Sequence, residues 1–160
     1  MTGTSKTRSS VLAMDMVLSV SPIQEDHAAL ERIFSGSRHP ATPESSWHLR
    51  QTATVPSALK RLKESLHALV ICERDLPLGD WKDLLEHSQK LADPPFLIVT
   101  SRHADDYLWA EALNLGAYDV LCKPFSSSEV MRVVSEALQR WKREHRPNPE
   151  HWNASVARCA

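Results

Sequence analysis

The sequence lacks any apolar run long enough to cross a membrane. A transmembrane helix needs roughly 20 consecutive apolar residues, and no stretch of this chain approaches that length. The run from Val11 to Val20, which follows Lys6 and Arg8, is interrupted by Asp15, and no small-residue cleavage site follows it. It therefore does not have the pattern of an export signal, and we expect a cytoplasmic protein with no membrane partner.

Cysteine is also scarce, and no metal-binding motif is present. Cys72, Cys122 and Cys159 lie far apart in the sequence, which indicates neither a disulfide framework nor a CxxC site. The eight histidines show no spacing of the HExxH kind, so they predict no metal centre. A formal net charge of -1 gives no overall electrostatic reason for direct binding to nucleic acid.

The patterns that are present predict strands and helices in alternation. Short apolar runs predict strands at residues 14–20, 47–53, 68–72, 96–100 and 119–122. Helical periodicity predicts helices at residues 22–34, 58–66, 81–91, 104–115 and 127–145. Capping boxes from Ser21 to Gln24 and from Ser126 to Glu129 would begin two of these helices, and Gly116 would end another.

Alternating strands and helices with short connections predict an α/β fold. We expect a doubly wound, flavodoxin-like sheet of five parallel strands in the order 2-1-3-4-5, with helices on both faces. The expected domain spans residues 14–145. Residues 1–13 and 146–160 have the composition of flexible tails.

Polar residues stand where several of the expected strands end. Ser21 follows the first strand, Glu73 the third, Thr100 and Ser101 end or follow the fourth, and Lys123 follows the fifth. The carboxyl ends of parallel strands meet at one edge of a sheet, where ligand chemistry is usually placed. The sequence therefore predicts one polar pocket containing a carboxylate, a hydroxyl and an ammonium group.

Two segments carry a resemblance to a known family. Residues 111–125 read EALNLGAYDVLCKPF, and the third strand LVIC is followed at residues 75–80 by DLPLGD. Together they resemble the receiver domain of bacterial response regulators, the phosphoacceptor module of chemotaxis and nitrogen regulators, and the likeness covers about residues 14–142. The resemblance implies a role in two-component (phosphorelay) signalling and a cis peptide bond before Pro124.

The chain departs from this family where active receivers carry their acids. By resemblance, active receivers bind Mg²⁺ with an acidic pair after strand one, and those positions are Ser21 and Pro22 here. The phosphoacceptor aspartate, counted back from Pro77, is replaced by Glu73. Glu25 and Asp26 lie nearby, but acids in a first helical turn suit the helix dipole without any metal. We therefore expect the magnesium site to be lost, with no cofactor.

These departures lead to one main hypothesis and two alternatives. In the main one, Glu73 pairs with Lys123, accepts a hydrogen bond from Thr100 or Ser101, and imitates part of the phosphorylated state. The chain would then be a phosphomimetic pseudo-receiver, an interaction module and not an enzyme, with no catalytic residue. Alternatively, Asp75 accepts phosphate from a histidine kinase in an active receiver. A flavin or nucleotide binder is the third reading. It needs a loop after the first strand that cradles a phosphate, and residues 21–24 are too short and too apolar for such a loop.

The resemblance also indicates where a partner would bind. Val120 occupies the position of the aromatic switch of active receivers, so that switch is expected to be absent. Trp109 lies on the outer side of the fourth helix and is either an interface anchor or a half-buried core residue. We expect a signalling protein as partner, with a homodimer possible, and no DNA-binding output domain in residues 146–160. Whether the chain stands alone or belongs to a larger regulator stays open.

Overall fold

The structure, a computed structural model, describes residues 15–36 and 47–145. The two expected tails and Met14 lie outside the described residues. The main sheet consists of β1 (Asp15–Val20), β2 (Trp47–Thr52), β3 (Leu69–Glu73), β6 (Phe96–Ser101) and β7 (Asp119–Cys122), all paired in parallel. Their order is β2-β1-β3-β6-β7, which confirms the expected flavodoxin-like arrangement.

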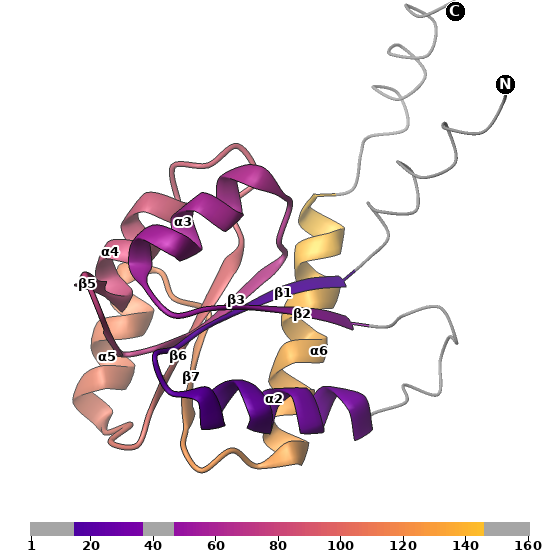
Figure 1. Ribbon diagram of the computed structural model, residues 1–160, viewed down its shortest axis with the longest axis vertical. Coiled ribbons are helices and arrows are strands. Elements are labelled where there is room, and N and C mark those ends of the chain that lie inside the picture. The colour runs from indigo at the N-terminus through magenta and orange to yellow at the C-terminus, as the bar shows by residue number, and fades with distance from the viewer. Residues whose placement is uncertain (1–14, 37–46, 146–160) are drawn as a thin grey trace, which may run out of the picture.

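Helices cover both faces of this sheet (Figure 1). They are α2 (Gln24–Gly36), α3 (Val55–Glu64), α4 (Trp81–Ser88), α5 (Asp106–Leu115) and α6 (Ser127–Glu144). One buried cluster joins the sheet to α2 and α6, and a second joins it to α3, α4 and α5. Because both faces are covered, β3 is buried at all of its positions, as its unbroken apolar sequence predicts.

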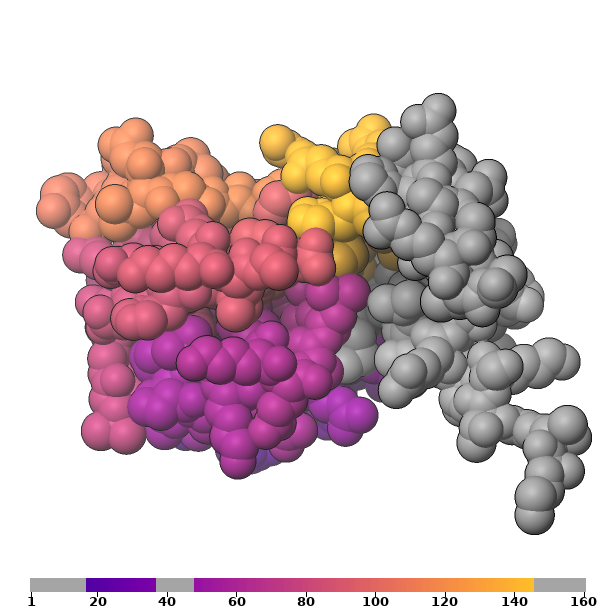
Figure 2. Space-filling model, turned by 90° about the horizontal axis from the view of Figure 1, so that it is seen from above, coloured from indigo at the N-terminus to yellow at the C-terminus, as the bar shows by residue number. Residues whose placement is uncertain are grey.

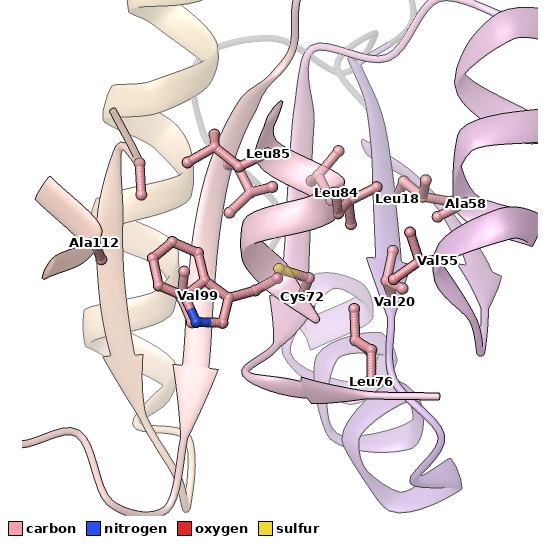
Figure 3. Close-up of a cluster of buried hydrophobic side chains, with 14 of the residues drawn as sticks. Leu18, Val20, Val55, Ala58, Cys72, Leu76, Leu84, Leu85, Val99 and Ala112 are labelled. Atoms are coloured by element: carbon pink, nitrogen blue, oxygen red, sulfur yellow. The ribbon is translucent and has the colours of Figure 1, made fainter. Parts of the chain in front are cut away.

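The second cluster lies directly behind the strand that carries Glu73. Figure 3 shows Cys72 of β3, Val99 of β6 and Leu84 of α4 as members of this cluster. Burial raises the pKa of the Cys72 thiol far above its ordinary value, so this cysteine packs as a small apolar residue and is not a reactive thiolate. The cluster therefore packs against the strand that ends in Glu73.

Two of the expected helix caps are wrong in detail. Helix α2 begins at Gln24 and not at Pro22, because the Ser21 hydroxyl accepts a hydrogen bond from the Ile23 N–H at 3.1 Å and does not cap the helix. Ser126 is the N-cap residue of α6, but its side chain makes no capping hydrogen bond. Gly116 ends α5 in the left-handed conformation with φ 104°, as expected.

A short hairpin, which periodicity did not indicate, follows β3. It pairs β4 (Asp75–Leu76) with β5 (Gly79–Asp80), and its turn contains Pro77 and Leu78. Leu78 has φ 60° and Gly79 has φ 133°. The Asp80 side chain then accepts hydrogen bonds from the backbone N–H groups of Lys82 and Asp83, which caps α4.

The strands begin at the end of the sheet that Figure 2 shows, where the yellow end of α6 lies beside the connection before β6. There the Trp141 indole N–H donates a 3.0 Å hydrogen bond to the Pro94 carbonyl. His67 precedes β3 at this end and is buried, with its Nδ1 at 3.1 Å from the Ser65 carbonyl. Within the described part of the chain its Nε2 has no hydrogen-bond partner.

His67 makes stability depend on pH. Burial, and to a smaller extent the charges of Arg50 and Arg61, lower its pKa below 6.5, while the hydrogen bond to Ser65 opposes this. As the pH falls below 6.5, the unfolded chain binds a proton that the folded chain does not bind, so folding becomes less favourable. We expect the urea concentration at the unfolding midpoint to decrease when the pH is lowered from about 7.5 to about 5.5, and to decrease less in His67→Asn. An equal fall in both proteins would contradict this assignment.

Candidate functional site

Three charged side chains from three elements meet at the carboxyl edge of the sheet. The Lys123 ammonium, just after β7, lies 3.0 Å from Asp26 Oδ2 of α2 and also contacts Glu73 Oε2 at the end of β3. The side chains of Lys123, Glu73 and Asp26 are only 6%, 9% and 11% exposed. The cluster therefore contains two buried carboxylates that share one buried ammonium.

Each carboxylate also accepts a hydrogen bond from a buried hydroxyl. Ser21 donates to Asp26 Oδ2 at 2.7 Å, and Thr100 donates to Glu73 Oε2 at 3.3 Å. Ser101 turns elsewhere, since its hydroxyl accepts a 3.0 Å hydrogen bond from the His103 N–H. The structure thus assigns the pocket hydroxyl to Thr100, which the sequence left open between Thr100 and Ser101.

The sheet register explains why these groups meet. Glu73 of β3 pairs with Thr100 of β6, and Ser101 pairs with Cys122, which precedes Lys123. Three neighbouring parallel strands therefore end at the same level and deliver a carboxylate, a hydroxyl and an ammonium side by side. Lys123 is followed by a cis peptide bond to Pro124.

Asp26 and His27 are parts of the site that the sequence interpretation missed. Asp26 was interpreted only as an acid suited to the helix dipole, yet its side chain is buried and bound to Lys123. His27 is also buried, with Nδ1 at 2.8 Å from the Ser19 hydroxyl and Nε2 at 2.9 Å from the Ser21 carbonyl. These contacts fix the start of α2 against the end of β1. The sequence signal that could have identified Asp26 was the presence of an acid a few residues after Ser21 and Pro22, the positions that correspond to the acidic pair of active receivers.

The donor set does not fit the Mg²⁺ site that the resemblance implies for active receivers. Mg²⁺ needs nearly octahedral oxygen ligands, but the Lys123 ammonium is bound by both carboxylates. Ser21 is already hydrogen-bonded to Asp26, and Pro22 is exposed and has no side-chain oxygen. Within residues 15–36 and 47–145, no group of three or more His, Cys, Asp or Glu side chains could hold a metal ion.

The other candidate residues lie outside this cluster. The Asp75 side chain is 78% exposed in β4, with Oδ2 at 3.3 Å from the Arg74 guanidinium. Val120 is buried in the cluster beneath α5, and Trp109 is half-buried against it. Tyr107, also on α5, is 76% exposed. Trp109 is thus partly a packing residue, and Tyr107 is the more exposed aromatic side chain of this surface.

Comparison of the sequence with known proteins finds regulatory proteins. No family model matches the chain. It is 35% identical over 99 residues to the transcriptional regulatory protein QseB of Escherichia coli O157:H7, an alignment that covers 59% of this chain and 45% of that protein. It is also 32% identical over 78 residues to the transcriptional regulatory protein CutR of Streptomyces coelicolor, covering 49% of this chain and 36% of that protein. The chain thus spans less than half the length of these curated relatives.

Solved structures agree on the fold. The signal receiver domain of a putative Luxo repressor protein from Vibrio parahaemolyticus matches with a TM-score of 0.72 and 21% identity, over 82% of this chain and 95% of that one. The beryllofluoride-activated NtrC4 receiver domain dimer matches with a TM-score of 0.68 and 21% identity, over 79% and 98% of the two chains. Among the described residues, no helix is both long enough and apolar enough to cross a membrane. The described part of the chain has the fold of response-regulator receiver domains.

Proposed function

We propose that this chain is a receiver-type module of a two-component signalling system that acts through protein contacts, without Mg²⁺-dependent phosphorylation. The observation that carries the proposal is the buried contact of Lys123 with both Glu73 and Asp26. By resemblance, the lysine and the hydroxyl of an active receiver hold the oxygens of the phosphoryl group. In this chain the corresponding groups, Lys123 and Thr100, bind a fixed carboxylate.

The charges around Lys123 support this reading. A phosphoryl group carries about two negative charges near neutral pH, and a single glutamate carries one. Glu73 and Asp26 together place two carboxylates on the same ammonium group. The cluster therefore imitates the charge that phosphorylation would bring, in a site whose donors do not fit the metal that phosphorylation requires.

The partner is proposed to be another signalling protein, bound at the surface formed by α5, β7 and α6. Tyr107 is exposed on this surface, and the curated relatives are named as transcriptional regulatory proteins. A second copy of the chain is the alternative partner, because a similarly folded receiver is described as a dimer. No enzymatic step is assigned to the module.

The proposal predicts the outcome of a phosphorylation experiment. Incubation of the chain with acetyl phosphate and Mg²⁺ is expected to add no phosphoryl mass, as measured by intact mass spectrometry. The physical reason is that the acceptor position holds a glutamate already bound to Lys123 and Thr100, and that the metal ligands are missing.

Matched variants separate this proposal from an active receiver that uses Asp75. Glu73→Asp tests whether restoring the shorter acid is sufficient, and Asp75→Ala removes the exposed candidate acceptor. A phosphoryl adduct on the parent chain that disappears in Asp75→Ala would contradict the proposal and assign the acceptor to Asp75. The exposure of the Asp75 carboxylate is the observation that keeps this second function under test.

A further inference from the structure

A cavity of about 610 Å³ opens beside the ionic cluster. It lies between α2, from Glu25 to Ile33, the connection after β6 and the turn from β7 to α6, and it shares Asp26 and Lys123 with the cluster. Figure 1 places the start of α2 and the turn before α6 at the same end of the sheet. Cavities of this volume are typical of sites for small organic molecules.

The charged groups that line the cavity are unequally neutralised. Lys123 is bound to Asp26, and the Arg32 guanidinium lies 2.9 Å from Glu25. Arg102 also lines the cavity, and no carboxylate among the described residues lies within ion-pair distance of it. The carboxylates of the cavity are thus already engaged, whereas the guanidinium of Arg102 is available to an anion.

The start of α6 adds a second attraction for an anion at the same cavity. Ser127, the first residue of α6, lines it. The hydroxyl of the N-cap Ser126 lies 3.2 Å from the Ser128 hydroxyl and accepts no hydrogen bond from a backbone N–H of the first turn. The first N–H groups of this helix therefore keep their capacity to donate, and the helix dipole favours negative charge there. By itself a helix start defines no site; here it adds to a cavity and a guanidinium.

The remaining wall is apolar. Ala29 and Ile33 of α2 face the cavity together with Phe125 from the turn before α6. Ile33 and Phe125 are only partly buried against the core of that face, so they keep apolar surface toward the cavity. A ligand that matched both parts of the wall would carry an acidic group and an apolar body.

We propose that this cavity binds a small organic anion, with its acidic group at Arg102 and the start of α6 and its apolar body against Ala29, Ile33 and Phe125. The proposal rests on the proposed function in one respect, because a module that is not switched by phosphorylation needs another input. A ligand in this cavity would lie against Asp26 and Lys123 and so would contact the cluster that replaces the phosphorylation site.

The test uses 1-naphthaleneacetate as the probe and the full chain as the protein, with binding measured by isothermal titration calorimetry. We expect saturable binding at one site. Arg102→Gln should weaken it by about tenfold or more, because a charge-assisted hydrogen bond is lost. Ala29→Phe, which fills part of the cavity, should also weaken it, and the neutral analogue 1-naphthaleneethanol should bind more weakly than the acid.

The matched control is Arg61→Gln, which removes an exposed arginine from α3 on the opposite face of the sheet and should leave binding unchanged. Circular dichroism checks that each variant is folded. Absence of saturable binding to the parent chain, or equal affinities of the parent and Arg102→Gln, would overturn the site. A phosphoryl adduct with acetyl phosphate would overturn the proposed function and leave this binding result as it is, so the two failures are distinguishable.

Discussion

Replacing Lys123 by methionine is expected to lower the free energy of unfolding by about 3–5 kcal/mol, because it leaves two buried carboxylates without their ammonium partner. The Lys123 side chain is 6% exposed, and the groups it binds, Glu73 and Asp26, are nearly as buried. Urea denaturation, followed by circular dichroism at neutral pH, measures the change. Methionine is apolar and of similar length, so the loss reports on the charge and not on a cavity.

Two companion variants sharpen this prediction. Asp26→Asn removes one carboxylate and leaves Lys123 paired with Glu73, so its cost should be smaller, about 1 kcal/mol. Lys90→Met removes a lysine whose side chain is 69% exposed and which pairs with the similarly exposed Glu86, and its effect should lie within about 1 kcal/mol. If Lys123→Met costs no more than Lys90→Met, the buried cluster does not hold the site together.

Replacing Trp81 by alanine is expected to have an effect of similar size, about 3–5 kcal/mol of unfolding free energy. Trp81 is the first residue of α4, is 2% exposed, and belongs to the buried cluster that contains Cys72 and Val99. Removing the indole leaves a cavity behind β3, the strand that ends in Glu73. Thermal and urea denaturation both measure the loss.

The controls for this variant come from the same chain. Trp81→Phe keeps most of the buried volume and should cost clearly less than the alanine variant. Trp109→Ala removes a tryptophan that is only half-buried against the same core, and it should likewise cost less. Equal losses for Trp81→Ala and Trp109→Ala would show that the core is not packed around Trp81 as the structure indicates.

The sequence by itself determined the sheet and most of the site. The unbroken apolar runs of β3 and β6 have the length and composition of strands covered on both faces, and such strands require helices in both layers. Strands that end together place the residues after them together, which is why Glu73, Thr100 and Lys123 could be assigned to one pocket. The helical periodicity of residues 127–145 likewise predicted α6, whose buried side runs from Val130 to Trp141.

Only the tertiary structure decided which other side chains enter that pocket. Asp26 and Lys123 are 97 residues apart, and their contact depends on how α2 is placed over the edge of the sheet, which periodicity does not specify. Whether Thr100 or Ser101 faces Glu73 depends on the register of β3 against β6. Local patterns report which face of an element is buried, whereas the position of one element along another is set by long-range packing, and that packing brought the second carboxylate to Lys123.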